Sequence, residues 1–536
     1  MQIMNYIKHI RNICLFAGLL ATASCKKNFE TINTPPLDAT DASTPEVFNS
    51  VISSLPLDAG EQSVLHAWIY PITQQAIITS GSYPYENAIN GLWANYYGAL
   101  ANYRIIEDRI SKESNPASMN NVYAMLKTVM AYKTIKMTNY FGSMPYSEAG
   151  YAAIKKAAAY KVPYDKQEDI YAAVLADLKW AVDNLAAGAD QYSVGNHETL
   201  LKNNVALWVK FANSLRLQVA LTMHDKNAAL ATTHVTEALG KPLLETGENI
   251  GLWPTQIPGL KFEWRQWSFS ANCYLRLGST MWNLMSSSNA PDGSGIFDVR
   301  AKVFFEGNNA NQWAAYPQNP LTTTPSEGGA PYDFNKRDAA WADKGAGCIY
   351  SPFNFYFEKD ITTIPELILT AAQVYLLKAE AYNRGIGVAA SPALAKAEYD
   401  KGIAASVNMW KGIAFNSPQW TENKPASATA TPAELTAITT NPVTAYNLGN
   451  AATALRQIYA QYWIDAFRQP WDAWTLLRRT GGKTPMSAAN TDYYNKNFSS
   501  YTRFVYPQEE FNFNFENWRA ETNSTDVSTT KLWIMP

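Results

Sequence analysis

Hydrophobic side chains recur at helical spacing along much of the chain. In five segments, apolar residues follow the i, i+3, i+4, i+7 pattern of a helix that buries one face. These segments are 122–135, 168–185, 208–219, 367–381 and 455–467. The chain has no comparable set of segments in which apolar and polar residues alternate as in strands. We therefore expect the helices to pack on one another in a mainly α fold.

One part of the pattern indicates paired helices. Small residues at Ala379, Ala381 and Gly385 precede a second group at Ala397 and Ala404, at the spacing of a tetratricopeptide-like repeat. A single copy of this spacing would also fit an ordinary helical hairpin. The helical patterns on both sides favour a helical-repeat scaffold.

Two regions lack this periodicity. Residues 225–365 are rich in Gly, Pro, Asn, Ser and Trp, and residues 412–450 are rich in Ala, Thr and Pro. Irregular segments of this length are usually functional or disordered, and the aromatic content of the first argues against disorder. We predict ligand-binding loops at 225–365 and a surface insertion at 412–450.

The first residues resemble a bacterial export signal. Residues 1–24 contain Lys8 and Arg11, no acidic residue and a short apolar run at 13–23, and they end at Ser24 before Cys25. The run is too short to span a bilayer, which takes roughly 20 residues. We predict a lipoprotein signal at 1–24, a lipid on Cys25, a polar tether at 25–44 and a single domain at 45–536. An ordinary secretory peptide is the alternative.

Composition narrows the class of protein. The 44 Lys and Arg nearly balance the 46 Asp and Glu, so the chain lacks the excess of basic residues that is typical of nucleic-acid-binding proteins. Aromatic residues make up 13% of the chain, and only 17% is charged. Cys273 and Cys348 could form a disulfide or be small buried hydrophobes. The sequence contains no ligand spacing for a metal, so we expect neither a metal nor a cofactor.

Several short motifs stand in a fixed order along nearly the whole chain. After Cys25 come FETINTP at 29–35, YFGSMPYSEA at 140–149 and YDKGIAAS at 399–406. The C-terminal part adds WDAW at 471–474, RRTG at 478–481, RFVYP at 503–507, Glu510, Asn514 and LW at 532–533. Together these motifs resemble the SusD/RagB family of nutrient-binding outer-membrane lipoproteins of Bacteroidota.

The resemblance implies a fold and a function. The protein would fold as a scaffold of tetratricopeptide-like helix pairs decorated by long loops. Its function would be non-catalytic: a lipid-anchored protein on the outer membrane, facing the cell exterior, captures an oligosaccharide and delivers it to a SusC-like TonB-dependent barrel. Some members of the family capture a peptide instead.

Aromatic residues in the irregular loops are the candidates for a ligand site. A sugar ring has an apolar face and a rim of hydroxyls, so a flat aromatic side chain flanked by polar groups can hold it. The candidates for such contacts are Tyr83, Tyr85, Asn87, Trp264, Arg265, Trp267, Trp313, Tyr316 and Tyr332. Each ring could instead fasten its loop to the scaffold, and we expect at least two of them to line a cleft.

Other motif residues are predicted to be structural. Gly142 suits the backbone turn after a helix, and Pro145 prevents the helix from continuing. Arg478 and Arg479 follow a core helix, so a buried ion pair is favoured over a ligand contact. Tryptophans on helical faces or in the motifs are assigned to the core: Trp93, Trp208, Trp463, Trp474 and Trp533.

Three alternatives to glycan capture stay open from the sequence. The first is peptide binding within the same family, and the second is a structural partner of the barrel with no ligand of its own. The third is a helical glycoside hydrolase, which needs two carboxylates at a defined separation. Carboxylates are available for that role at Glu263, Asp292, Asp298 and Glu306, but no spacing selects a pair.

Overall fold

The structure is a computed structural model that describes residues 42–64, 68–78, 86–188, 190–318, 320–327, 333–486 and 501–536. The predicted signal peptide, Cys25 and nearly all of the predicted tether lie outside these ranges, as do Tyr83, Tyr85 and Tyr332. Asn87 lies in a described helix, but its side chain is outside what the structure describes.

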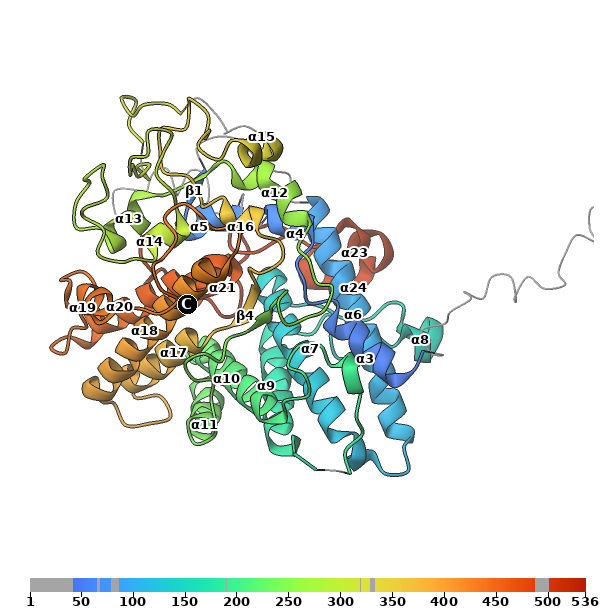
Figure 1. The fold of residues 1–536 in the computed structure, drawn as a ribbon. Coiled ribbons are helices and arrows are strands. Elements are labelled where there is room, and N and C mark those ends of the chain that lie inside the picture. The colour runs from blue at the N-terminus through green and yellow to red at the C-terminus, as the bar shows by residue number, and fades with distance from the viewer. Residues whose placement is uncertain are drawn as a thin grey trace, which may run out of the picture.

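Long helices form the scaffold, and the mainly α prediction is confirmed (Figure 1). The helices are α6 (Glu86–Lys112), α7 (Asn120–Phe141), α9 (Gln167–Asn184), α10 (Val205–Met223), α11 (Ala228–Leu239), α17 (Ala371–Arg384), α18 (Pro392–Asn416), α20 (Ala451–Asp465) and α21 (Pro470–Arg479). Neighbours in the chain pack side by side, as α10 does with α9 and α11, and α17 with α18. Contact between α10 and α17 joins the two halves of the scaffold.

Short helices and two-stranded sheets connect the long helices. The short helices are α3 (Thr44–Ile52), α4 (Ala59–Val64), α5 (Tyr70–Thr73), α8 (Ala152–Lys155), α12 (Trp264–Asn272), α13 (Ser279–Met285), α14 (Ala301–Phe304), α15 (Phe334–Ala339), α16 (Tyr356–Lys359), α19 (Pro432–Thr440), α23 (Gln508–Phe513) and α24 (Phe515–Thr522). Single 3₁₀ turns are η2 (Pro116–Met119), η3 (Lys156–Ala159), η4 (Gly195–His197) and η5 (Ala466–Arg468). The strands are β1 (Ile77–Ile78), β2 (Ile250–Leu252), β3 (Leu275–Arg276) and β4 (Glu366–Leu369). Both sheets are antiparallel, β1 with β3 and β2 with β4.

The pair α17 and α18 shows how the sequence sets the repeat geometry. Thr370 and Gln373 form a capping box at the start of α17, and Gly385 ends the helix with a φ of +69°. On α18, a Cβ at Gly402 would lie 2.8 Å from the Leu376 side chain. Glycine at this position therefore lets the two helices approach closely, as the small residues of the sequence pattern predict.

Two expectations need correction. The sequence pattern places Leu367 on a helix, but this residue lies in β4, a run of four buried residues that precedes α17. A fully buried short strand gives no alternation, so its apolar residues match helical spacing by chance. The segment 412–450 is more than a surface insertion, because α18 continues to Asn416 and the segment buries Trp420, Ile438 and Tyr446 against the core.

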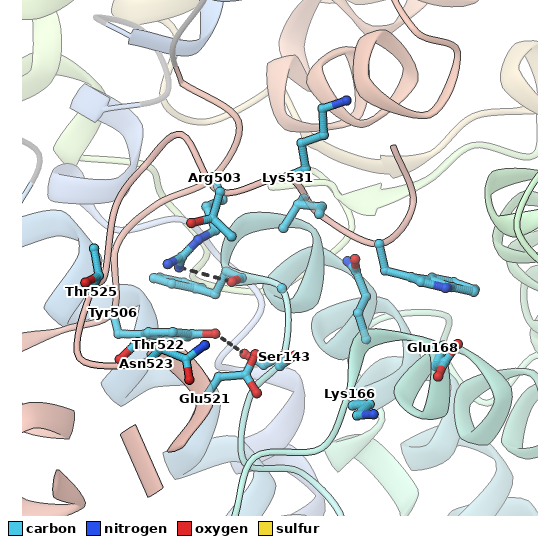
Figure 2. A pocket seen from close by; sticks show the side chains of 16 residues that line it. Ser143, Lys166, Glu168, Arg503, Tyr506, Glu521, Thr522, Asn523, Thr525 and Lys531 are labelled. Atoms are coloured by element: carbon cyan, nitrogen blue, oxygen red, sulfur yellow. Dashed lines mark hydrogen bonds between the residues drawn. The ribbon is translucent and has the colours of Figure 1, made fainter. Parts of the chain in front are cut away.

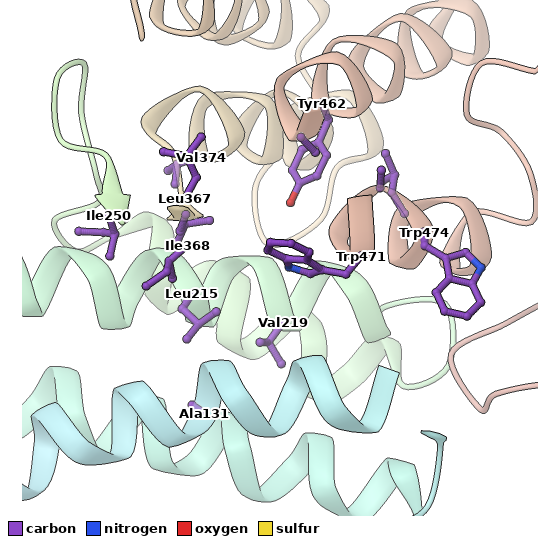
Figure 3. Packing of buried hydrophobic residues seen from close by; sticks show 14 of the residues in the cluster. Ala131, Leu215, Val219, Ile250, Leu367, Ile368, Val374, Tyr462, Trp471 and Trp474 are labelled. Carbon is purple, nitrogen blue, oxygen red and sulfur yellow. The ribbon is translucent and has the colours of Figure 1, made fainter. Parts of the chain in front are cut away.

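One large cluster of buried hydrophobic residues forms the main core, and it is rich in aromatic residues. Figure 3 shows its centre, where Trp471 of α21 lies between Tyr462 of α20 and Val219 of α10. The tryptophans assigned to the core from sequence are buried, except for the half-buried Trp533. In the part of the chain that the structure describes, no helix has the length and apolar character of a membrane span.

A buried ion pair ties α21 to α17, as the sequence predicts. The Arg479 guanidinium donates to both carboxylate oxygens of Glu380, at 2.9 and 2.7 Å. Arg478 lies on the Trp474 ring, 3.8 Å from its centroid, and donates to the backbone carbonyl of Thr502 at 2.9 Å. Arg479 therefore fastens α21 to α17, and Arg478 fastens the backbone at Thr502 to α21.

Candidate functional site

The aromatic segment 262–267 leads into α12 and presents one tryptophan to solvent. Phe262 is buried and meets the half-buried Trp264 edge-on, with ring centroids 6.0 Å apart. Trp267 is 82% exposed, more than any other described large hydrophobic residue. An indole carries a large apolar surface that is usually at least partly covered. Trp267 is thus available to contact a ligand.

Arg265 lies beneath this surface and anchors it. Its side chain is fully buried, and its guanidinium donates to the backbone carbonyls of Asp360 at 3.3 Å, Ile364 at 2.8 Å and Pro365 at 3.1 Å. Burial, with a smaller effect from nearby Arg468, lowers the pKa of Arg265 to about 9. This geometry corrects the expectation that Arg265 contacts a ligand. It holds α12 on the segment 360–365 instead.

Trp313 also proves to be a packing residue. It is only 8% exposed, and its ring stacks on Trp282 with centroids 5.9 Å apart and planes 12° apart. A Cβ at Gly293 would come within 2.7 Å of the Trp313 ring, so this tryptophan fills the turn around Gly293. The prediction that Trp313 contacts a ligand is therefore wrong, because this residue fastens a loop instead.

Tyr316 keeps a partly exposed ring. It meets Tyr350 edge-on, with centroids 4.8 Å apart, and the Tyr350 hydroxyl donates to the Pro325 carbonyl at 2.9 Å. Burial raises the pKa of both phenols, so both stay neutral hydrogen-bonding groups at physiological pH. Tyr316 is positioned by packing but can still offer part of its ring to a ligand.

Strand β3 brings the candidate segments together. Leu275 and Arg276 follow α12 and pair with β1, whose Ile78 is the last described residue before Tyr83 and Tyr85. On the other side of β3, Gly278 forms a bridge with Tyr316. The backbone thus joins the segment of Trp264 and Trp267 to that of Tyr316. Tyr83, Tyr85, Asn87 and Tyr332 stay predictions, because their side chains lie outside the described residues.

Two of the four carboxylates considered for hydrolysis are buried in ion pairs. Asp298 is buried and accepts from Arg300, and Glu306 is buried against Arg337 and Lys344. Each of these two carboxylates is therefore neutralised by a cation inside the protein. Glu263 and Asp292 lie at the surface in separate segments.

The structure contains no disulfide between Cys273 and Cys348 among its described residues, and both side chains are buried. Burial raises the pKa of the Cys273 thiol to about 12. The sequence leaves open whether these cysteines form a disulfide or act as small buried side chains, and the structure shows them as small buried side chains.

A cavity of about 530 Å³ lies between the loop after α7, the start of α9 and the C-terminal segment (Figure 2). Its wall is built from motif residues: Arg503 donates to the Phe141 carbonyl at 3.3 Å, and the Tyr506 hydroxyl donates to the Ser143 carbonyl at 2.6 Å. Four further charged side chains line it, namely Lys166, Glu168, Glu521 and Lys531. This cavity therefore suits a ligand that carries charges of both signs.

A second cavity, of about 580 Å³, lies against α18, and we call it the α18 groove. Its lining comes from segment 246–256, from one face of α18, and from Thr363 and Thr429. The sequence prediction missed it, although Trp253 stands among Asn249, Thr255 and Gln256. An aromatic ring among polar side chains, the same pattern that marks Trp264 and Trp267, indicates such a site.

Comparison with known proteins identifies the family. A family model described as "Starch-binding associating with outer membrane" matches residues 40–507. The chain therefore belongs to the SusD-like family, as the motifs indicate. No curated protein matches the sequence.

Solved structures share the fold. A chitin-binding protein is 22% identical, with a TM-score of 0.65 over 92% of this chain and 99% of that one. A SusD homologue from Bacteroides fragilis is 15% identical, with a TM-score of 0.67 over 91% and 99%. A chitin-binding SusD homologue from Flavobacterium johnsoniae is 19% identical, with a TM-score of 0.60 over 91% and 97%.

Proposed function

We propose that this protein is a non-catalytic, cell-surface lipoprotein that captures a neutral oligosaccharide and delivers it to a SusC-like TonB-dependent transporter in the outer membrane. The observation that carries the proposal is Trp267, an exposed indole on a helix that the buried Arg265 anchors. Because the helix backbone is held in place, less order has to be imposed when an aromatic face on it binds the C–H face of a sugar.

The surroundings of Trp267 support this assignment. Trp264 is half-buried beside it in the same segment, and Tyr316 is joined to that segment through β3. The family description names starch, and two of the similar structures are described as chitin-binding. The lipid on Cys25 and the transporter partner come from the sequence motifs.

Peptide capture is the second candidate, and one observation favours it. The cavity of Figure 2 has two lysines and two glutamates on its lining, which could pair with the carboxylate and the ammonium group of a peptide. Weaker binding of a short peptide after Lys166→Ala or Lys531→Ala would support this second function.

Titration of a Trp267→Ala variant tests the proposal. Maltoheptaose and chitohexaose serve as soluble probes, and isothermal titration gives the Kd. We expect a loss of about 2 kcal/mol at this site, the size of a binding hot spot, which is about 30-fold in Kd. The control is Phe513→Ala, because Phe513 is also exposed, at 70%, and lies on α23 in the C-terminal segment.

The two variants separate a specific contact from a general surface effect. Both remove an exposed ring, so neither is expected to lower the melting temperature. An unchanged Kd for Trp267→Ala, or an equal loss for Phe513→Ala, would exclude Trp267 as the binding platform.

A further inference from the structure

The α18 groove is separate from the residues used in the proposed function. Its lining includes none of the aromatic candidates named from the sequence and no residue of the cavity in Figure 2. Its volume of about 580 Å³ falls in the range of ligand pockets, roughly 300–1,000 Å³.

One face of α18 forms the floor of the groove. Its lining residues recur at helical spacing: Ala405, Asn408, Met409, Gly412, Ile413 and Asn416. Ala405, Met409 and Ile413 are buried and supply an apolar surface, whereas the two asparagines are more exposed. An apolar floor flanked by amides suits a pyranose ring, which has an apolar face and a rim of hydroxyls.

Hydrogen bonds orient two of the amides. Asn408 accepts from the backbone N–H of Ala430 at 2.7 Å, and Asn249 accepts from that of Ala371 at 3.0 Å. Each Oδ1 is thereby fixed, and the Nδ2 groups donate to no other described residue. The groove thus has two oriented amide donors for the hydroxyls of a ligand.

Trp253 supplies the aromatic side of the groove. Its indole N–H donates to the Asn249 carbonyl at 3.3 Å, so the polar edge of the ring is already satisfied. The ring is half-buried, and its remaining surface is apolar. A ring held in this way can stack on the C–H face of a sugar.

Among the described residues, the lining of the α18 groove contains no charged side chain. Its polar side chains are amides and hydroxyls: Asn249, Gln256, Asn408, Asn416, Thr246, Thr255, Thr363 and Thr429. The cavity of Figure 2, by contrast, includes Lys166, Glu168 and Arg503. A charged ligand would find no counter-charge in the α18 groove, whereas hydroxyl groups would find both donors and acceptors.

We propose that the α18 groove is a second carbohydrate-binding site, which takes a neutral pyranose unit independently of the Trp267 surface. This second site goes beyond the proposed function, because one protein would then hold two oligosaccharides, or two parts of one polymer, at once.

Gly412 allows the groove to be filled without disturbing the core. A Cβ at this position would meet only the Ala428 carbonyl oxygen, at 3.6 Å, which is ordinary contact. Gly412→Phe should therefore fold normally and occupy the groove. Gly98→Phe is the matched control, because Gly98 is an exposed glycine of α6 where a Cβ would have no described atom within 4 Å. Trp253→Ala is an independent second variant.

Isothermal titration with maltoheptaose and chitohexaose gives the number of sites and the Kd of each. We expect two molecules of the bound sugar per wild-type protein and per Gly98→Phe protein. Gly412→Phe should reduce this to one, and Trp253→Ala should weaken one site at least tenfold. The Kd at the other site should change less than twofold.

The outcomes separate the groove from the Trp267 surface. If Gly412→Phe and Trp253→Ala both keep the number of sites and their affinities, the groove proposal is overturned and the Trp267 surface stands. If Trp267→Ala changes nothing while Gly412→Phe abolishes binding, the groove stands and the Trp267 surface fails. If neither sugar binds the wild type, both proposals are overturned.

Discussion

The ion pair between Glu380 and Arg479 allows a quantitative test of how α21 is held on α17. Glu380 is buried and accepts from Arg479 at 2.9 and 2.7 Å, from Arg384 at 2.9 Å and from the Tyr459 hydroxyl at 2.9 Å. Glu380→Gln keeps the shape of the side chain but leaves Arg479 buried without a counter-charge. Breaking a buried pair in this way costs about 3–5 kcal/mol of unfolding free energy.

The assay is urea unfolding of Glu380→Gln, Arg479→Met and the double variant, from which a coupling free energy follows. We expect the double variant to lose at least about 2 kcal/mol less than the sum of the two single losses, because one substitution already removes the pair. Additive losses would refute the reasoning. Glu516→Gln is the control, since its ion pair with Arg519 is exposed and should contribute less than about 1 kcal/mol.

The same pair predicts a pH dependence. Burial opposes ionisation of Glu380, but Arg479 and Arg384 outweigh it and hold its pKa below the usual 4.5. The folded state thus binds this proton less tightly than the unfolded state, and the stabilisation is present above pH 4.5 and lost as the pH falls through the folded pKa. The free-energy difference between wild type and Glu380→Gln should shrink over that range.

Three further substitutions test the scaffold and the anchor of the site. Gly402→Val should cost about 1–3 kcal/mol of unfolding free energy, because its Cβ would lie 2.8 Å from Leu376. Burial raises the pKa of Asp472 to about 6, so its ionisation destabilises the folded wild type. Asp472→Asn cannot ionise, so its unfolding free energy should rise relative to that of the wild type, by up to about 3 kcal/mol, as the pH increases from 4 to 7. Arg265→Met should lower both sugar affinity and stability, the latter by about 3 kcal/mol for three lost hydrogen bonds.

Each of these predictions has a contradicting outcome. Gly98→Val controls for the valine itself, and equal effects at positions 98 and 402 would exclude close helix contact as the cause. A pH-independent difference between Asp472→Asn and wild type, measured by urea unfolding, would show that the carboxyl titrates normally. If Arg265→Met retains wild-type stability, the residue does not anchor α12.

The sequence predicts the helical scaffold well, because helices that bury one face leave a periodic pattern. It predicts the surroundings of α12 only in part. Trp267 stands out as an aromatic residue among polar ones, and the structure exposes it. Arg265 looks identical in pattern, yet it is buried, because its partners are carbonyls about a hundred residues further along the chain. No local signal reveals such a partner.

The α18 groove shows the same limit. Trp253, Thr363 and Asn408 come from three distant segments, and only the packing of β2 against β4 and of α17 against α18 brings them together. Buried ion pairs are easier to foresee. Arg478 and Arg479 are the last two residues of the amphipathic helix α21, so their burial could be predicted, although the identity of Glu380 as the partner could not.

The central claim is capture of a neutral glycan without turnover. Titration of the protein with maltoheptaose, chitohexaose and a mixed peptide digest, followed by an assay for new reducing ends, tests it most directly. We expect saturable binding of at least one oligosaccharide, no binding of the digest and no release of reducing ends. Binding of the peptides alone, or release of reducing ends by the purified protein, would contradict it.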